Sequence, residues 1–239
     1  MTGALGEFFG TMILILLGDG VVAGVLLKHS KGENAGWLAI TAGWAFAVVC
    51  GVFTAMAFGA PGHLNPAVTA GAIAIGAVRV NEAMVHIGAQ FAGAFAGAIL
   101  VWLHYLPHWA ETAEPDFKLG IFCTIPAIRR PLANFVCEVI GTFVLVFVGS
   151  ALVRVVPTGG LAPYLVGILV WSIGLSLGGT TGYAINPARD LGPRIAHFLL
   201  PIPGKRDSDW GYSWVPVLGP LVGGMIAARA FVLLSDLTH

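Results

Sequence analysis

HLNPA at residues 63–67 recurs as AINPA at residues 184–188, so a short Asn-Pro-Ala pattern occurs twice in the chain. Asparagine is a strong N-cap residue, and proline is favoured at the first position of a helix. Asn65 and Asn186 are therefore each expected to begin a helix. A single Asn-Pro-Ala is an ordinary helix cap. The occurrence of two copies at matching places in the chain makes the pattern informative.

Both copies lie in segments that separate long apolar runs. A helix needs about 20 mostly apolar residues to cross a bilayer. Each copy starts a shorter apolar stretch, and residues 66–76 as a helix would reach only about 16 Å. A short apolar helix of this kind is expected to enter the membrane and return, enclosed by protein. The six runs long enough to span are 5–27, 37–58, 82–105, 134–153, 161–181 and 214–234.

A second repeated pattern shows that the chain has two related halves. EFFGT at residues 7–11 recurs as EVIGT at residues 138–142. Each half has three spans and a half-helix after its second span. Three spans are an odd number, so the two halves lie upside down relative to each other in the membrane. An inverted repeat with broken helices is an architecture of transport proteins.

The expected fold is therefore an all-α membrane protein with six transmembrane helices and two re-entrant half-helices. We expect one channel domain over residues 1–239, with the first repeat at about 1–105 and the second at about 134–239. The link at 106–133 contains several prolines and charges, and it reads as an ordinary surface loop.

Composition supports this fold and excludes several functions. Of the 239 residues, 57% are hydrophobic and 10% are charged, against about 25% charged in soluble domains. The net charge is zero, which gives no electrostatic basis for binding nucleic acid. Three cysteines without a CxxC indicate neither a zinc site nor a disulfide framework. Since no nucleophile–base set or metal cluster is apparent, we expect neither an enzyme nor a cofactor. The N-terminus has no basic region before its first apolar run, which is expected to be retained.

The two half-helices predict a barrier to cations. If they enter from opposite faces, their N-termini meet near the middle of the membrane. Each end carries about half a positive charge, so the pair opposes any cation, including hydronium. The oxygens of Asn65 and Asn186 would be engaged in capping. Their amide N–H groups are then expected to stay free for a passing hydroxyl group.

The six spans, the inverted repeat and the paired Asn-Pro-Ala motifs resemble the aquaporin and aquaglyceroporin family over essentially the whole chain. The resemblance implies a right-handed aquaporin-type bundle that works as a passive channel. It also implies a homotetramer in the cell membrane, with one pore per subunit and both termini in the cytoplasm.

The resemblance implies a narrow selectivity filter that includes Arg189, which follows the second Asn-Pro-Ala directly. A cation in the first turn of a helix opposes the helix dipole, and such a broken local rule points to a functional site. Asp190 suits the dipole and is expected to pair with Arg189. An aspartate at this place resembles the glycerol-conducting branch. The alternative for Arg189 is a side chain that reaches to the lipid headgroups.

Three further positions resemble the glycerol branch. Gly174 stands where water-selective members carry histidine, so it would widen the constriction. Tyr183 matches an aromatic filter position, and Trp44 matches the filter tryptophan if the loop before the first motif has one extra residue. The alternative for both aromatic residues is membrane-interface or packing positions.

These residue types suggest how a polyol would pass. Trp44 and Tyr183 would form an apolar corner for its carbon skeleton, while Arg189 donates N–H groups to its hydroxyls. Backbone carbonyls of residues 59–64 and 180–185 would form a ladder of acceptors, because non-helical backbone at membrane depth must line a cavity or be buried.

Four ionisable residues lie in or near the predicted membrane segments. The resemblance implies that Glu7 and Glu138 brace the re-entrant loops; the alternative is acids at headgroup level. His63 is expected to line the cytoplasmic approach, and the alternative is a structural histidine. Asp19, in the middle of the first span, has no assigned role beyond a channel mouth or a subunit contact.

The charge distribution disagrees with the orientation that the resemblance implies. The rule that positive residues stay inside would place the N-terminus outside. The arginines on the N-terminal side are Arg79, Arg154 and Arg229, and the basic residues on the other side are Lys28, Lys31, Lys118, Arg129, Arg130, Lys205 and Arg206.

The expected function is passive passage of glycerol, other small uncharged polar solutes and some water, with exclusion of protons and ions. The alternatives are a water-selective pore, a channel for small protonated acids such as lactic acid, and a secondary transporter. A secondary transporter would need coupling-ion ligands, and the spans contain few ionisable groups. The candidate residues are Trp44, Gly174, Tyr183 and Arg189 in the filter; Asn65, Pro66, Ala67, Asn186, Pro187 and Ala188 in the two motifs; and His63, Leu64, Glu7, Glu138 and Asp190 as lining or bracing groups.

Overall fold

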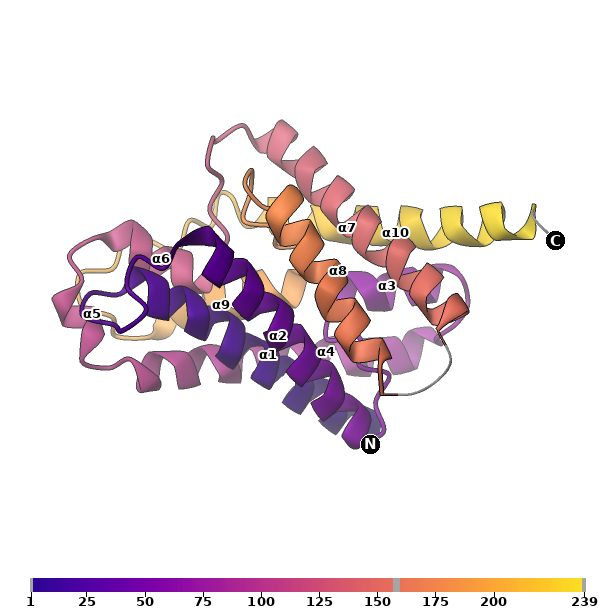
Figure 1. Ribbon diagram of the computed structural model, residues 1–239, viewed down its shortest axis with the longest axis horizontal. Coiled ribbons are helices and arrows are strands. Elements are labelled where there is room, and N and C mark those ends of the chain that lie inside the picture. The colour runs from indigo at the N-terminus through magenta and orange to yellow at the C-terminus, as the bar shows by residue number, and fades with distance from the viewer. Residues whose placement is uncertain (1, 157–159, 238–239) are drawn as a thin grey trace.

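The computed structural model describes residues 2–156 and 160–237, which form ten helices and no strand (Figure 1). Six of the helices are longer and four are shorter. The longer ones are α1 (Thr2–Leu26), α2 (Gly36–Ala57), α4 (Val80–His104), α7 (Pro131–Val155), α8 (Ala162–Ser176) and α10 (Trp214–Asp236). The shorter ones are α3 (Pro66–Ala74), α5 (His108–Glu111), α6 (Pro115–Phe122) and α9 (Pro187–Leu199). The shorter helices α3 and α9 each follow the second longer helix of a repeat, as the sequence predicts for the two half-helices.

Five of the longer helices are long and apolar enough to cross a membrane, and α8 is shorter than predicted. The sequence predicts a span over 161–181, but α8 has 15 residues and ends at Ser176. At 1.5 Å per residue it reaches about 22 Å. Gly178 and Gly179 follow, and glycine disfavours the helix interior. The chain turns there, with the Gly182 N–H donating to the Gly178 carbonyl at 2.9 Å.

The segment 106–133 is not an ordinary surface loop, so that prediction was wrong. It contains α5 and α6, and the side chains of Trp109, Leu119 and Phe122 are at most 1% exposed. The prolines and charges of the segment suggest a solvated loop, but apolar residues between them pack inward. The segment therefore caps one end of the bundle, where α5 and α6 lie in Figure 1.

The two repeats exchange their half-helices. Within each repeat the long helices pair, α1 with α2 and α4, and α7 with α10 and α8. However, α3 of the first repeat packs mainly on α10, and α9 of the second packs mainly on α4. Glycines allow the helices to approach closely: a Cβ on Gly93 would lie 2.2 Å from the Phe8 carbonyl oxygen, and one on Gly223 2.3 Å from that of Val139.

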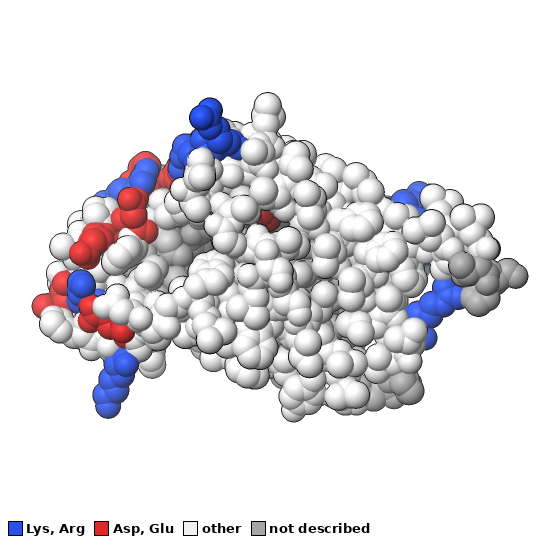
Figure 2. Space-filling model, turned by 45° about the horizontal axis from the view of Figure 1, so that its top comes forward, with Lys and Arg blue, Asp and Glu red and all other residues white. Residues whose placement is uncertain are grey.

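The surface carries its charge at the ends of the molecule. Figure 2 shows Lys, Arg, Asp and Glu gathered at the end that holds α5 and α6, a few basic residues at the opposite end, and a broad uncharged face between them. Large apolar side chains are exposed on the long helices. Examples are Phe46, Val136, Ile168, Leu218 and Ile226, each 48–62% exposed. A bilayer covers such a belt, and the chain is a multi-pass membrane protein.

Candidate solute pore and filter

The two Asn-Pro-Ala motifs meet and hydrogen-bond each other. Asn65 caps α3 by accepting from the Ala67 N–H at 2.8 Å, and its Nδ2 donates to the Ile185 carbonyl at 2.8 Å. Asn186 caps α9 by accepting from the Ala188 N–H at 3.0 Å, and its Nδ2 donates to the Leu64 carbonyl at 2.8 Å. The N-termini of the half-helices therefore lie together, as the sequence predicts.

The amide groups are less free than expected. The sequence predicts that the N–H donors of both asparagines are free for solute, but one donor of each binds a carbonyl of the opposite loop. An asparagine amide carries two N–H donors, so one remains on Asn65 and one on Asn186. The cross-links fix the orientation of both amides.

Unusual backbone conformations shape both loops. Leu64, Tyr183 and Ile185 have φ values of 52°, 39° and 43°. Positive φ is costly for bulky or β-branched residues and persists where the surroundings hold it, often at functional sites. In this structure the surroundings include the Asn cross-links, which use the carbonyls of Leu64 and Ile185.

Part of the predicted carbonyl ladder is engaged by protein donors. Besides Leu64 and Ile185, the Thr180 carbonyl accepts from the Ala127 N–H at 3.0 Å. Within the described residues, no hydrogen bond uses the other nine carbonyls of these two stretches, those of Gly59, Ala60, Pro61, Gly62, His63, Thr181, Gly182, Tyr183 and Ala184. These carbonyls remain available as acceptors.

Glu7 sits beneath the first loop and is fully buried. Its carboxylate accepts from the N–H groups of His63 at 2.8 Å and Leu64 at 2.7 Å, and from Gln90 Nε2 at 2.8 Å. Gln90 also donates to Thr69 Oγ1 at 3.1 Å. Burial excludes the alternative of a headgroup-level acid. The sequence analysis missed Gln90, since no local pattern marks it.

Glu138 makes the equivalent contacts in the second repeat and is 1% exposed. Its carboxylate accepts from Thr181 Oγ1 at 2.6 Å, from the Ala184 N–H at 3.0 Å and from the Ile185 N–H at 2.8 Å. The two carboxylates thus bind the backbone just before each Asn-Pro-Ala motif. Each satisfies N–H groups that the irregular loop leaves without helical partners.

Arg189 lies in the first turn of α9 and is 7% exposed. Its guanidinium carbon is 4.0 Å from the centroid of the Trp44 ring, a cation–π distance. Its Nη1 is 3.6 Å from Oδ1 of Asp19. Burial of Arg189 and of Trp44, which is 4% exposed, excludes headgroup and interface positions for both.

The expected pairing of Arg189 with Asp190 was wrong. Asp190 binds Arg194 at 2.8 and 3.0 Å and accepts from the N–H and Oγ1 of Thr124 at 2.8 and 2.7 Å. Consecutive helical residues do not face each other, whereas residues four apart do. The i,i+4 spacing of Asp190 and Arg194 was the signal that could have revealed their pairing.

Gly174 faces the aromatic ring of Tyr183. A Cβ on Gly174 would lie 2.9 Å from Tyr183 Cζ and 3.0 Å from Thr41 Cγ2. Trp37, which the sequence analysis missed, donates its Nε1–H to the Gly174 carbonyl at 3.1 Å. Its ring meets the Tyr183 ring edge to face, with centroids 5.8 Å apart. Gly174 therefore makes room for an aromatic ring in a packed position.

Comparison with known proteins places this arrangement in a family. Residues 1–231 match the sequence profile of the major intrinsic proteins. The chain belongs to the major intrinsic protein family. It is 60% identical over 230 residues to glycerol uptake facilitator protein 3 of Lactiplantibacillus plantarum, covering 96% of this chain and 95% of that protein. It is 56% identical over 231 residues to a probable glycerol uptake facilitator protein of Thermotoga maritima, covering 97% and 98%.

The fold agrees with this assignment. The X-ray structure of the aquaglyceroporin from Plasmodium falciparum superposes with a TM-score of 0.87 at 29% identity, over 99% of this chain and 98% of that one. The protein is thus a channel of the major intrinsic protein family, not an enzyme, and has the aquaporin-type bundle that the sequence predicts.

A network in this major intrinsic protein joins α9 to the segment that links the two repeats. Arg194, fully buried, pairs with Asp190 and donates to the carbonyls of Ser208 at 2.6 Å and Asp209 at 3.1 Å. Asp190 in turn holds Thr124 in the segment after α6. A buried pair with all these partners ties α9 to both chain segments around it.

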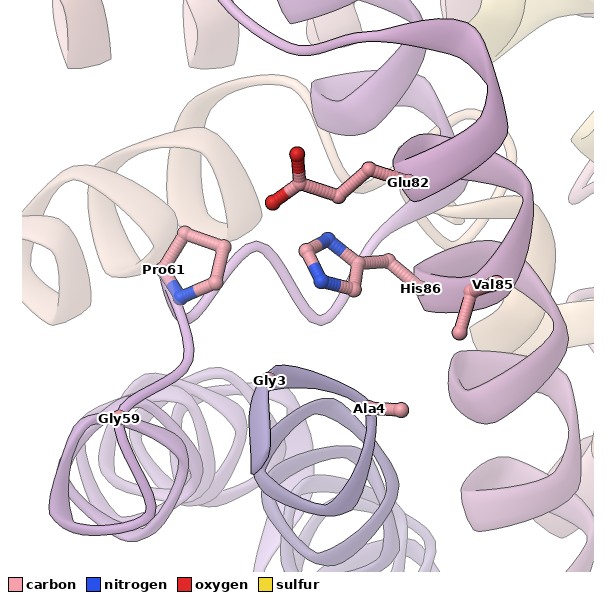
Figure 3. A pocket seen from close by; sticks show the side chains of 7 residues that line it. All are labelled: Gly3, Ala4, Gly59, Pro61, Glu82, Val85 and His86. Carbon is pink, nitrogen blue, oxygen red and sulfur yellow. The ribbon is translucent and has the colours of Figure 1, made fainter. Parts of the chain in front are cut away.

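The channel has a cavity of about 390 Å³ away from the filter. Figure 3 shows it between the start of α1, the loop after α2 and the first turns of α4, with Glu82 and His86 projecting toward Pro61. His63 lies nearby, with its ring centroid 6.5 Å from that of His86 and its Nδ1 3.1 Å from Thr69 Oγ1. The lining residues are Gly3, Ala4, Gly59, Pro61, Glu82, Val85 and His86.

Proposed function

We propose that this channel conducts glycerol and other small uncharged polar solutes, with some water, and excludes protons and ions. The observation that carries the proposal is the stack of Arg189 on Trp44, together with the Tyr183 ring that packs against Gly174. Its relatives named glycerol uptake facilitators support the same solute class.

A polyol fits the chemistry of this filter. Glycerol has a carbon skeleton on one side and hydroxyl groups on the other. Trp44 and Tyr183 offer apolar surface, and the guanidinium of Arg189 offers N–H donors. A solute sheds its water only where protein groups replace it, and the free carbonyls of the loops supply acceptors. An apolar solute would leave the N–H donors of Arg189 without hydrogen-bond partners. A larger polyol would clash with the rings of Trp44 and Tyr183.

Positive charge at the two narrow points would exclude cations. The paired N-termini of α3 and α9 direct their dipoles at the same place, and Arg189 adds a full charge in the first turn of α9. A cation or proton would have to pass both the paired helix N-termini and Arg189. We assign Asn65, Pro66 and Ala67, with Asn186, Pro187 and Ala188, to this central barrier, and Glu7 and Glu138 to its support.

We also propose the assembly and orientation of the channel. Residues 1–239 form one channel domain of two repeats, embedded in the lipid bilayer of the cell membrane. Four copies form a homotetramer with a pore in each, and both termini lie in the cytoplasm. The family resemblance supports this orientation, whereas the surplus of lysine and arginine near α5 and α6 opposes it.

Stopped-flow light scattering on proteoliposomes tests the proposed solute. Purified protein should accelerate glycerol uptake well above that of empty liposomes and pass some water, without a proton current under a pH gradient. Water flux without glycerol flux would make the chain a water-selective pore. Flux of lactic acid without glycerol would make it an acid channel, and a proton-coupled glycerol gradient would make it a secondary transporter.

A further inference from the structure

Asp19 is a buried acid in the middle of α1, and its carboxylate lacks the hydrogen bonds that a buried acid normally makes. It is fully buried, and neither of its carboxylate oxygens has a hydrogen-bond partner within the described residues. Arg189 Nη1 is also buried without a hydrogen bond, and it lies 3.6 Å from Asp19 Oδ1. A buried charge is costly unless it is paired, so these two groups are each other's electrostatic partners.

Gly18, the residue before Asp19, contacts Trp44, the aromatic member of the Arg189–Trp44 stack. A Cβ on Gly18 would lie 2.2–2.5 Å from Cζ3, Cε3 and Cη2 of the Trp44 ring. The ring therefore packs directly against the backbone of α1. Gly18 thus supports Trp44, and Asp19 faces the guanidinium that Trp44 carries. Two consecutive residues of α1 contact both members of the stack.

Among the described residues, no acid other than Asp19 forms an ion pair with Arg189. Asp190 is saturated by Arg194 and Thr124. Within the described residues, the Arg189 side chain makes no hydrogen bond, and its one ion pair within 4.0 Å is with Asp19. Asp19 lies away from the surface, so the earlier alternatives of a channel mouth or a subunit contact do not apply to it.

We propose that Asp19 is a positioning residue for the filter. Its carboxylate draws Nη1 of Arg189 toward α1, holds the guanidinium on the Trp44 ring and turns the remaining N–H groups toward the solute. Its charge also offsets part of the charge of Arg189, so the filter still opposes cations but attracts anions less strongly. This inference rests on the proposed function for the solute and deepens it by naming what fixes the filter.

Asp19→Asn is the sharpest variant, because it keeps the size and removes the charge. It should lower the ratio of glycerol to water permeability by at least about threefold, within the range expected for coupled groups in contact. It should also raise the leak of a small anion such as nitrate, since Arg189 would then be unbalanced. A structural role alone would change the two permeabilities in proportion and leave the anion leak unchanged.

A double-mutant cycle with Arg189→Val isolates the interaction. Asp19→Asn should change the permeability ratio in the wild-type background and leave it unchanged when Arg189 is already valine. Equal effects in both backgrounds would overturn the proposal. Asp116→Asn, at an exposed position that pairs with Arg206 and not with Arg189, is the matched control and should leave the ratio as in the wild type.

If Asp19→Asn does not insert into the membrane or does not fold, the same measurements are made on Asp19→Ser. If both variants fail to fold while Arg189→Val folds, Asp19 acts independently of Arg189 and the proposal is wrong. Measurements on the wild-type protein separate the proposed solute from the proposed role of Asp19. Wild-type protein that passes water but no glycerol contradicts the proposed solute, and the anion leak of Asp19→Asn still decides the positioning role.

Discussion

Arg189 opposes its own helix dipole and has a full positive charge in a nearly closed site. Its neighbours explain how it stays there: the Trp44 ring lies 4.0 Å from the guanidinium carbon, and Asp19 lies beside Nη1. A tryptophan face attracts a cation by about 2 kcal/mol or more when the pair is desolvated. The filter arginine is therefore held by a ring and a carboxylate from two different helices.

Replacing Arg189 should loosen selectivity without closing the pore. Arg189→Val removes the donors and the charge but keeps an apolar wall. Discrimination among small polyols should fall, and a partial leak of monovalent cations should appear, because the dipoles of α3 and α9 still oppose cations. Glycerol flux and cation leak are compared at matched protein density. Unchanged polyol discrimination with no added leak would remove Arg189 from the filter.

Gly174 controls how much space lies beside Tyr183. Gly174→His would put side-chain atoms where a Cβ alone already lies 2.9 Å from the Tyr183 ring. We expect glycerol permeability to fall much more than water permeability in stopped-flow measurements. Gly149→His, at a position with no atom within 4 Å of a Cβ, is the control. Equal losses of both permeabilities in folded Gly174→His protein would show that Gly174 does not limit the filter.

At the scale of elements, two short helices are held in place by carboxylates from the long ones. Glu7 of α1 binds the loop before α3, and Glu138 of α7 binds the loop before α9. The repeat extends to the residue four positions later: Thr11 and Thr142 each donate to the carbonyl of the corresponding glutamate, at 2.7 and 2.8 Å. The EFFGT and EVIGT patterns are therefore repeated in contacts as well as in sequence.

Glu138→Gln should destabilise the second loop. The carboxylate accepts three hydrogen bonds from this loop, whereas the NH₂ group of a glutamine cannot accept from these donors. A buried donor left without a partner costs about 1–3 kcal/mol. We expect a lower unfolding temperature in detergent together with reduced glycerol flux. Glu7→Gln should behave alike, since its environment is equivalent, and exposed Glu111→Gln should not. A stable, fully active Glu138→Gln protein would contradict the bracing role.

At the scale of the whole molecule, the folded segment between the repeats joins the filter helix. Thr124 follows α6 and binds Asp190, which pairs with Arg194 on the same helix. Arg194 reaches the carbonyls of Ser208 and Asp209 beyond α9. One end of the bundle is thus a continuous cap, and it contains most of the charged side chains seen in Figure 2.

The orientation of the chain in the membrane follows two conflicting signals, and we expect the family's orientation to prevail. The pore fold is too specific to invert without exchanging the roles of its two loops. A tag after the C-terminus should be protected from protease in intact cells and cleaved in inverted vesicles. The cysteine of Arg130→Cys, at an exposed position on the side of α5 and α6, should react with an impermeant reagent in intact cells. Cleavage of the tag in intact cells would support the charge rule instead.

The sequence by itself determined the architecture, and its family resemblance supplied the candidate filter residues. Helix capping by Asn65 and Asn186, the spans and the half-helices depend on contacts between neighbouring residues, which a linear pattern records. The repeat then implied that the two motifs meet. Arg189, Tyr183 and Gly174 became candidates because their positions relative to the second motif match filter positions of the family that the chain resembles.

Only the tertiary structure decided which groups hold the filter. Asp19 and Arg189 are far apart in the chain, and their approach depends on how α4 packs against both α1 and α9. The positive φ of Leu64, Tyr183 and Ile185 arises because the opposite asparagine and the buried glutamates hold the loops there. The early end of α8 and the buried face of α6 likewise depend on packing. Long-range ion pairs and strained loops have no local sequence signature, because their energy comes from neighbours that folding brings together.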